Sequence, residues 1–330
     1  MPKLGNPGVL CSGNIVYDTL MQPVDDLHWG ATTRVDTIEY HVGGNGANTA
    51  RALAKLGVPV RLLGAVGSDE QGRWALHTIE QSGVDVRGVL QVDGPTSATI
   101  AAVNSCGDRK FFHCLGASRY AFPEPIQFTP EFCVGIRHYH LSALFVLPKL
   151  RPHGADTLAR AREAGLSTSF DTNWDLEGRW MQTLEPCLPH IDLLFMNEPE
   201  ARMIAGSADP ATAGRAVLHR GVRVAVLKLG ARGSAIYTRN QEILCPAFEV
   251  DAVDTTGAGD CYVAGFLAEW LENGSLAEAG KLGNAVGALS VRKIGSVTGV
   301  LSRADTEAWM KSARFRKQGA AETAKGALNS

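Results

Sequence analysis

The chain has 330 residues, of which 45% are hydrophobic and 20% are charged, and its formal net charge at pH 7 is −2. This balance excludes a wholly disordered chain. The charge offers no basic excess to a nucleic-acid backbone or a membrane surface, so we expect neither partner. The sequence also lacks a run of about 18 uncharged apolar residues, and therefore predicts no membrane-spanning helix.

Two further features predict a cytoplasmic location. The first residues lack the apolar segment of a secretion signal. The seven cysteines are an odd number and include no Cys-x-x-Cys pair, as expected for reduced thiols.

The predicted elements change character along the chain. Residues 13–40 and 92–115 read as β-ribbon segments, with alternating side chains at 36–42, 99–103 and 110–114, and predict β-strands outside the main sheet. From residue 130 onward, predicted strands and helices alternate. The strands are 137–143, 167–171, 192–196 and 222–229, with a further β-like run at 244–253. The helices are 154–164, 176–184, 198–205 and 211–219.

This alternation predicts an α/β fold in which a parallel sheet is covered by helices on both faces. We expect one domain over residues 1–312, with 13–42 and 92–116 as the inserted β layer. Residues 313–330 contain few apolar side chains after Phe315 and predict a flexible tail.

The most informative motif is Asp-Thr-Thr-Gly-Ala-Gly-Asp at residues 254–260, and the apolar spacing that follows it predicts a helix. Gly257, Ala258 and Gly259 lack bulk, so their backbone N–H groups can approach an anion at the helix start. An isolated aspartate in a first helical turn is more often a simple helix-start carboxylate. Beside an anion, however, Asp260 suits a base that takes a proton from an attacking hydroxyl.

A second glycine-rich stretch, His-Val-Gly-Gly-Asn-Gly-Ala-Asn, begins at position 41 and also joins a predicted strand to a predicted helix. We expect Asn45 to cap this helix and Gly57 to end it. A tight turn does not by itself require Gly43, Gly44 or Asn48. These three residues predict contacts from backbone N–H groups and an amide to the hydroxyls of a ligand.

Together the two stretches resemble the signatures of the PfkB (ribokinase-like) family of carbohydrate and nucleoside kinases, in the same order and with similar spacing. The resemblance extends over roughly residues 8–306. It implies a Rossmann-like three-layer α/β sandwich with a mostly parallel central sheet and a small β lid. It also implies ATP-dependent phosphorylation of a hydroxyl on a small sugar or sugar derivative. Asp260 matches the family's general base, and residues 257–259 match its anion hole.

The resemblance implies roles for further residues, one position at a time. Asn14 and Asp18 resemble the pair that binds sugar hydroxyls. Asn197 and Glu200 resemble an Asn-x-x-Glu that organises Mg²⁺ and phosphates, with Glu200 acting on the metal indirectly. The positions that match nucleotide-binding residues are Asn197, Lys228, Gly230, Gly233 and Asn284. The positions whose backbone carbonyls match a monovalent-cation (K⁺) site are Asp254 and Thr256.

The chain also departs from the family pattern. Lys228 stands where the family has threonine. Asp171 and Asn173 keep the beginning of an Asp-x-Asn-x-Arg motif, but Asp175 replaces its arginine and removes a positive charge near the phosphates. Residues 140–147 contain no carboxylate to match the glutamate with which ribokinases contact the sugar, so ribose itself is a less favoured acceptor.

Several alternatives remain open. A kinase acting on an adenosine-like nucleoside is the first, because Phe111, Phe112 and His113 suit stacking on a base or a sugar face. A non-catalytic sensor of sugars or nucleotides is the second, although a pure binder gains nothing from Asp260. A nicotinamide-dependent dehydrogenase would need a glycine where the chain has Tyr262. Finally, such kinases often form homodimers through the lid, whose exposed edge suits pairing.

Overall fold

The structure is a computed structural model that describes residues 8–207 and 209–316. The strands of its larger sheet are β1 (Gly8–Ser12), β4 (Val60–Gly67), β5 (Asp85–Val92), β8 (Ile136–Ser142), β9 (Ser167–Asp171), β10 (Leu193–Asn197), β11 (Val224–Lys228), β12 (Ser234–Tyr237) and β13 (Glu242–Cys245). They lie side by side in the order β13-β12-β11-β10-β9-β8-β1-β4-β5. All neighbours are parallel except in the pairs β11–β12 and β12–β13 at one edge. The predicted, mostly parallel central sheet is therefore confirmed.

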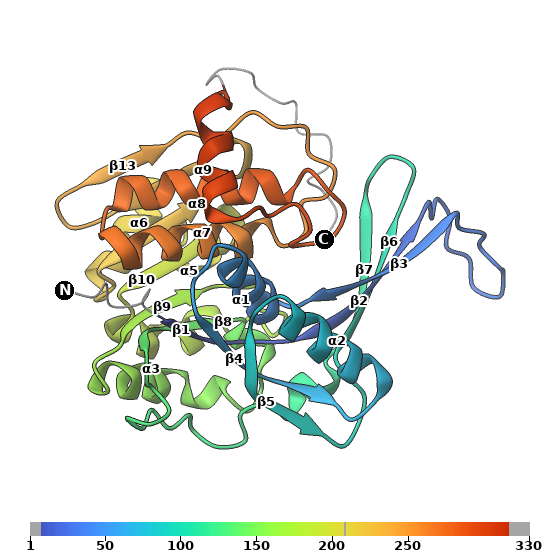
Figure 1. The fold of residues 1–330 in the computed structure, drawn as a ribbon, viewed down its shortest axis with the longest axis horizontal. Helices are drawn as coiled ribbons and strands as arrows, with labels where there is room; N and C mark the ends of the chain where they lie inside the picture. Colours follow the sequence, from blue (N-terminus) through green and yellow to red (C-terminus); the bar gives the residue numbers. More distant parts are fainter. Residues whose placement is uncertain (1–7, 208, 317–330) are drawn as a thin grey trace.

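Helices cover both faces of this sheet (Figure 1). Successive side chains of a strand point to opposite faces, so Val9 and Cys11 of β1 belong to one core while Leu10 belongs to the other. The helices of the first face are α1 (Asn45–Lys55), α2 (Glu70–Gln81), α7 (Ala258–Asn273) and α8 (Leu276–Ser290). The helices of the opposite face are α3 (Gly154–Glu163), α4 (Trp180–Leu184), α5 (Glu198–Ala205) and α6 (Pro210–His219). Near the end of the described chain, α9 (Arg303–Ser312) packs against α8.

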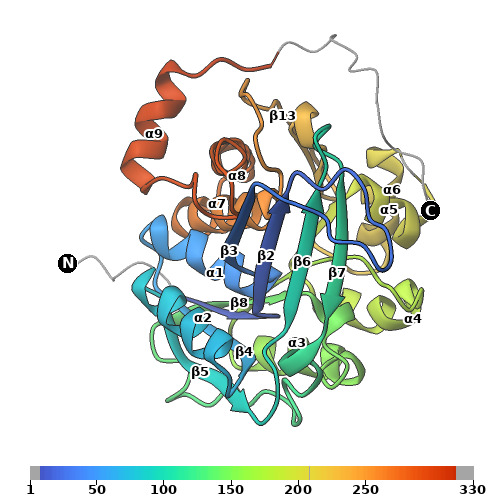
Figure 2. The same ribbon diagram turned by 90° about the vertical axis from the view of Figure 1, so that its right-hand side faces the viewer.

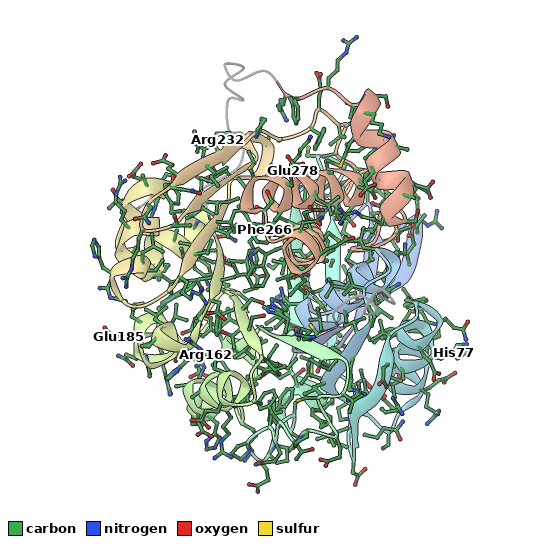
Figure 3. The ribbon with its side chains drawn as sticks, turned by 60° about the vertical axis from the view of Figure 1, so that its left-hand side comes forward. His77, Arg162, Glu185, Arg232, Phe266 and Glu278 are labelled. Carbon is green, nitrogen blue, oxygen red and sulfur yellow. The ribbon has the colours of Figure 1, made fainter. Side chains whose placement is uncertain are left out.

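The side chains follow this layering. Phe266 of α7 is fully buried and lies inside the molecule, whereas the exposed residues His77 and Glu185 lie at its edges (Figure 3). None of the helices in the described ranges combines the length and apolar character that crossing a bilayer requires.

A separate four-stranded sheet forms the lid. Its strands are β2 (Val16–Gln22), β3 (Thr37–Gly43), β6 (Ala98–Val103) and β7 (Arg109–Cys114), in the order β3-β2-β6-β7. The lid projects from one side of the main body, and its strands lie side by side in Figure 2. Both predicted β stretches thus contribute to one sheet outside the central one.

Two predicted elements are shorter than expected. The β-like run at 244–253 ends at Cys245, because Pro246 has no N–H to continue the ladder. The helix expected over 176–184 is reduced to α4, since Gly178 has a φ of 69° and the Asp175 carboxylate accepts the backbone N–H groups of Glu177 and Trp180. These contacts shape a turn before the helix.

The start of the predicted tail packs against the body. Phe315 forms an isolated bridge with Phe248, and their ring centroids lie 4.8 Å apart. The rest of the predicted tail, residues 317–330, lies outside the described residues.

Candidate active site

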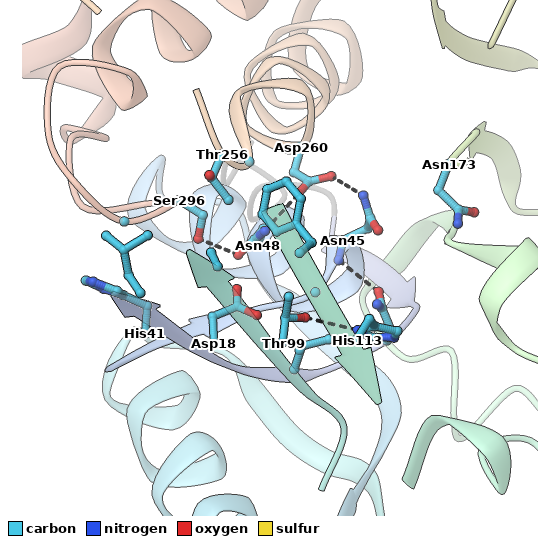
Figure 4. A pocket seen from close by; sticks show the side chains of 18 of the residues that line it. Asp18, His41, Asn45, Asn48, Thr99, His113, Asn173, Thr256, Asp260 and Ser296 are labelled. Atoms are coloured by element: carbon cyan, nitrogen blue, oxygen red, sulfur yellow. Dashed lines mark hydrogen bonds between the residues drawn. The ribbon is translucent and has the colours of Figure 1, made fainter. Parts of the chain in front are cut away.

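A cavity of about 450 Å³, termed the lid cavity, lies between the lid and the start of α7 (Figure 4). The lid strands form one wall, and the starts of α1 and α7 form a large part of the rest. The positions predicted from the sequence that line it include Asn14, Asp18, Gly44, Asn48, Asp254, Thr256, Gly257 and Asp260. The fold therefore gathers the two glycine-rich stretches and the N-terminal pair in one place.

Asp260 lies in the first turn of α7, and both of its oxygens are held. Asn45 Nδ2 donates to Oδ1 at 2.9 Å, and Asn48 Nδ2 donates to Oδ2 at 2.8 Å. Asn48 is itself oriented by Ser296, whose hydroxyl donates to Asn48 Oδ1 at 2.7 Å. Burial raises the pKa of Asp260 above its usual value, while the two amides act in the opposite direction. A buried carboxyl that faces a cavity and has a raised pKa suits proton acceptance.

The prediction that Asn45 caps α1 is wrong. The capping position is occupied by Gly44, which has a φ of 94° and makes no side-chain hydrogen bond. The backbone N–H of Asn45 instead donates to Asn14 Oδ1 at 2.8 Å. Since Asn14 satisfies the start of α1, the Asn45 amide is available to Asp260.

The start of α7 is open toward an anion. It follows Gly257, whose φ of 71° is accessible to glycine without strain, and glycine has no side chain that could cap the helix. A Cβ at this position would also lie 2.5 Å from the Ser296 Cβ. The N–H groups and dipole of an uncapped helix start favour negative charge. The geometry therefore suits the predicted anion hole.

A second cavity of about 370 Å³, termed the rear cavity, lies on the other side of the α7 start and against α8. The predicted positions that line it are Lys228, Gly230, Gly233, Ala258, Gly259 and Asn284. Asn284 Nδ2 donates to the carbonyls of Cys245 and Pro246 at 2.9 and 3.1 Å, and so fixes one wall. Gly230 and Gly233 belong to the turn between β11 and β12. Gly257 and Asp260 thus line the lid cavity, while Ala258 and Gly259 line the rear cavity.

Asp18 on β2 points into the lid cavity, and Gly43 makes room for it (Figure 4). A Cβ at position 43 would lie 1.8 Å from Asp18 Oδ2, so this carboxylate position requires glycine there. Burial raises the pKa of Asp18 to about 7, and the nearby charge of Asp254 adds to the effect. Beside Asp18, Thr99 Oγ1 and His113 Nδ1 lie 3.0 Å apart. Gly43 therefore has a structural reason that the sequence did not reveal.

Sequence reasoning missed Arg109 at the start of β7. Its Nη1 lies 2.8 Å from Asp254 Oδ1 and donates to Thr256 Oγ1 at 2.7 Å. Asp254 also accepts the backbone N–H groups of Thr256 and Gly295, each at 2.9 Å. Burial would raise the pKa of Asp254, but these donors and the guanidinium hold it below its usual value. The ion pair links the lid to the loop before α7. Strand alternation could have placed Arg109 on the inner face of the lid, but only the fold reveals its partner.

Other predicted residues lie beside the cavities. Glu200 Oε2 accepts the backbone N–H of Asn197 at 2.8 Å and the Thr172 hydroxyl at 2.6 Å, which closes a capping box at the start of α5. Among the described residues, neither Asn197 nor Glu200 is part of the lining of the lid or rear cavity. In the same part of the chain, no group of three or more His, Cys, Asp or Glu residues is placed to hold a metal.

The Asp-x-Asn-x-Asp segment is split between two places. Asn173 lines the lid cavity, apart from the group around Asp260 (Figure 4). Asp175 is buried, and its Oδ1 accepts from Arg151 Nη2 at 2.6 Å. Asp175 is therefore neutralised by its own arginine.

Comparisons with known proteins agree with the fold. The pfkB family of carbohydrate kinases matches residues 9–303. The ATP-dependent ribose-1-phosphate kinase of Halopiger xanaduensis is 32% identical over 292 residues, which cover 82% of this chain and 91% of that protein. Among solved structures, Arabidopsis thaliana ribokinase in complex with ribose and ATP has a TM-score of 0.80 at 24% identity, covering 93% of this chain and 99% of its own. The nucleoside kinase of Methanocaldococcus jannaschii has a TM-score of 0.79 at 22% identity, with the same coverage. These likenesses confirm the predicted fold class.

Proposed function

The chain belongs to the pfkB family of carbohydrate kinases, and we propose that it transfers the γ-phosphoryl group of ATP to a hydroxyl of a small sugar or sugar derivative. One observation carries this proposal: Asp260 lies at the open start of α7, whose residues 257–260 line the lid cavity and the rear cavity in turn. In-line phosphoryl transfer needs a base on one side of an anion-binding element and a nucleotide on the other.

Each cavity has its own task in this proposal. The acceptor occupies the lid cavity, where Asn14, Asp18 and Asn48 offer hydrogen bonds to hydroxyls. ATP occupies the rear cavity, whose proposed binding residues are Lys228, Gly230, Gly233 and Asn284. Asp260 takes the proton of the attacking hydroxyl, and the backbone N–H groups of residues 257–260 stabilise the developing charge.

Cations complete the proposed site. Because the described residues offer no metal cluster of their own, Mg²⁺ would arrive with the phosphates of ATP, and Glu200 would act on it indirectly through the ordered start of α5. The backbone carbonyls of Asp254 and Thr256 are the proposed ligands of K⁺. Rates measured in K⁺ and in a bulky organic cation would test that site.

An adenosine-like nucleoside is the second candidate acceptor, and the apolar part of the lid cavity favours it. This part is lined by Phe111, Val146, Trp174 and Leu176. Phe111, Trp174 and Leu176 are largely exposed. Aromatic and aliphatic side chains of this kind suit a planar base.

The decisive experiment is an acceptor screen with ATP and Mg²⁺. The panel contains hexoses, ketoses, sugar acids, ribose, adenosine and the ribose 1-phosphate on which the 32% identical relative acts by its name. Acceptor-dependent ADP release, with a phosphomonoester identified by phosphorus NMR, would support the proposal. ATP binding without ADP release for any acceptor would instead support the non-catalytic sensor.

We also propose a homodimer that forms through the outer face of the lid, in the reducing environment of the cytoplasm. The large apolar residues exposed on this face are Ile38, Tyr40, Ile100 and Phe112. The seven cysteines, all within the described ranges, are free of disulfides, which fits a reducing compartment. Light scattering should show a dimer, and Phe112→Glu should shift it toward the monomer.

A further inference from the structure

Lys228 is the last residue of β11, and its ammonium group is held inside the molecule. Its Nζ donates to Asp171 Oδ1 at 2.5 Å. The side chains of Lys228 and Asp171 are only 13% and 2% exposed. The family resemblance predicts a threonine at position 228 and so gives no reason for this buried ion pair.

The ammonium lies beside the first turn of α7. A Cβ added to Gly259 would lie 3.2 Å from Lys228 Nζ, so this glycine lets the lysine approach the helix start. Lys228 lines the rear cavity together with Ala258 and Gly259, while Asp260 faces the lid cavity. The ammonium is therefore placed on the side of the α7 start that faces the rear cavity, where we propose that ATP binds.

The charges around Lys228 keep it protonated. Burial would lower its pKa, but the carboxylates of Asp171, Glu200 and Asp260 raise the pKa of this lysine. A permanently charged ammonium at this point can offset negative charge on a phosphoryl group.

Few other cationic side chains line the two cavities. Among the described residues, the lining of the lid cavity includes no lysine or arginine, and the lining of the rear cavity includes Lys228 and Arg316. The arginine that the family pattern would supply at position 175 is replaced by Asp175, which is paired with Arg151. Lys228 thus offers the positive charge that the segment 171–175 has lost.

We propose that Lys228 is a catalytic residue that contacts the γ-phosphoryl group of ATP during transfer, and that Asp171 is its positioning residue. This inference rests on the proposed function. In the step, the acceptor oxygen forms a bond to the γ-phosphorus while the bond from that phosphorus to the β–γ bridging oxygen breaks. The hydroxyl proton passes to Asp260, and ADP leaves with the bridging oxygen. Lys228 keeps its proton and offsets the charge on the moving phosphoryl oxygens.

The test compares Lys228→Met with Lys228→Arg and the wild type. ADP lacks the γ-phosphoryl group, so Lys228→Met should weaken ATP binding about tenfold more than ADP binding when both are measured by calorimetry. Its single-turnover transfer rate should fall by about 10²-fold or more, as when one preorganised donor is removed from a developing oxyanion. Lys228→Arg should recover part of both effects. A purely structural lysine would weaken ATP and ADP binding equally, and that result would overturn the proposal.

Two further variants control for the possibility that Lys228→Met destabilises the fold. Lys228→Met leaves the buried Asp171 carboxylate without its partner, which is destabilising. The double variant Lys228→Met/Asp171→Asn removes both charges and should show the same selective loss of ATP affinity. Arg160→Met removes a surface cation paired with Asp156 on α3 and should leave the ATP-to-ADP affinity ratio unchanged. If the wild type phosphorylates no acceptor, the proposed function fails, yet an unchanged affinity ratio in the double variant would still refute the role of Lys228 independently.

Discussion

The two walls of the lid cavity are built in different ways. The deep wall consists of Asn45, Asn48, Asp260 and Ser296, and the lid wall consists of Asp18, Thr99, Phe111 and His113. In the deep wall, Asp260, Asn48 and Ser296 are at most 5% exposed and are joined by hydrogen bonds. In the lid wall, by contrast, Phe111 is 57% exposed.

In the proposed mechanism, this difference assigns the chemistry to the deep wall and the recognition of the acceptor to the lid wall. The deep wall rests on the packed helices α1 and α7, so the proposed base has one fixed position before any acceptor arrives. The lid wall belongs to a sheet outside the main core, and the Arg109–Asp254 ion pair joins it to the loop before α7. A wall that can move away can admit an acceptor and then exclude water.

Removal of the proposed base, Asp260, should have the largest effect on the rate of phosphoryl transfer. Asp260→Asn keeps the shape of the side chain but cannot accept the hydroxyl proton, so kcat should fall by about 10²-fold or more. ATP affinity should stay near that of the wild type. Steady-state rates on the acceptor found in the screen would measure the loss. The matched control is Asp156→Asn, which changes a first-turn aspartate of α3. Near-normal kcat in Asp260→Asn would contradict the assignment of the base.

Breaking the link between the walls should have the next largest effect. Arg109→Met removes a guanidinium that pairs with Asp254, and a hydrogen bond to a charged group contributes about 1.5–3 kcal/mol. We expect kcat/KM for the acceptor to fall about tenfold or more, because a tenfold change corresponds to about 1.4 kcal/mol. The ADP dissociation constant should not change.

The control for this link is Arg87→Met, which breaks an exposed ion pair with Asp85 outside the cavity. Its kcat/KM should equal that of the wild type. Arg109→Lys keeps the charge and should recover part of the activity. If Arg109→Met lowered ADP affinity as much as it lowered kcat/KM for the acceptor, the Arg109–Asp254 ion pair would stabilise both binding sites. It would then not act through the lid alone.

The same contrast explains what could be predicted from the sequence. The alternation of strands and helices after residue 130 was sufficient for a parallel central sheet, although its strands β1, β4, β5 and β12 were not predicted. Alternating side chains were sufficient for the lid strands and the glycine motif for the placement of Asp260 at a helix start, because these are local signals. The roles of Asn45, Gly43 and Arg109 depend on partners at residues 260, 18 and 254. No periodicity within a single segment specifies such contacts, which arise only when distant segments pack together.

Loss of the Asn48 amide should change the pKa of the proposed base in the deep wall. Its amide donates to Asp260 Oδ2 and favours the ionised carboxylate, so Asn48→Ala should raise the pKa of Asp260. The acid limb of the kcat profile should move to higher pH by about one unit, since one unit corresponds to about 1.4 kcal/mol. Thr49→Val is the matched control, because it removes a buried hydroxyl without a partner from the same helix. A profile that stayed in place would show that Asn48 does not tune the base.

The smallest expected effect tests the lid wall through pH. Burial raises the pKa of Asp18 to about 7, and only the ionised carboxylate accepts hydrogen bonds from acceptor hydroxyls with both oxygens. As pH falls from 8 to 6, Asp18 becomes protonated, so kcat/KM for the acceptor should fall several-fold. His113 faces the same cavity, but burial lowers its pKa, so it remains neutral over most of this range.

Asp18→Asn cannot titrate, so its kcat/KM should be low but nearly independent of pH wherever Asp260 stays ionised. Asp36→Asn, which changes an exposed carboxyl just before β3, should keep the wild-type profile. Because kcat/KM reports the free enzyme and kcat reports the bound complex, the two walls should separate in the data. The decrease caused by protonation of Asp18 should appear in the pH profile of kcat/KM and be absent in Asp18→Asn. The decrease caused by protonation of Asp260 should remain in the pH profile of kcat. If Asp18→Asn kept the limb near pH 7, that titration would belong to the deep wall, and recognition and chemistry would share one group.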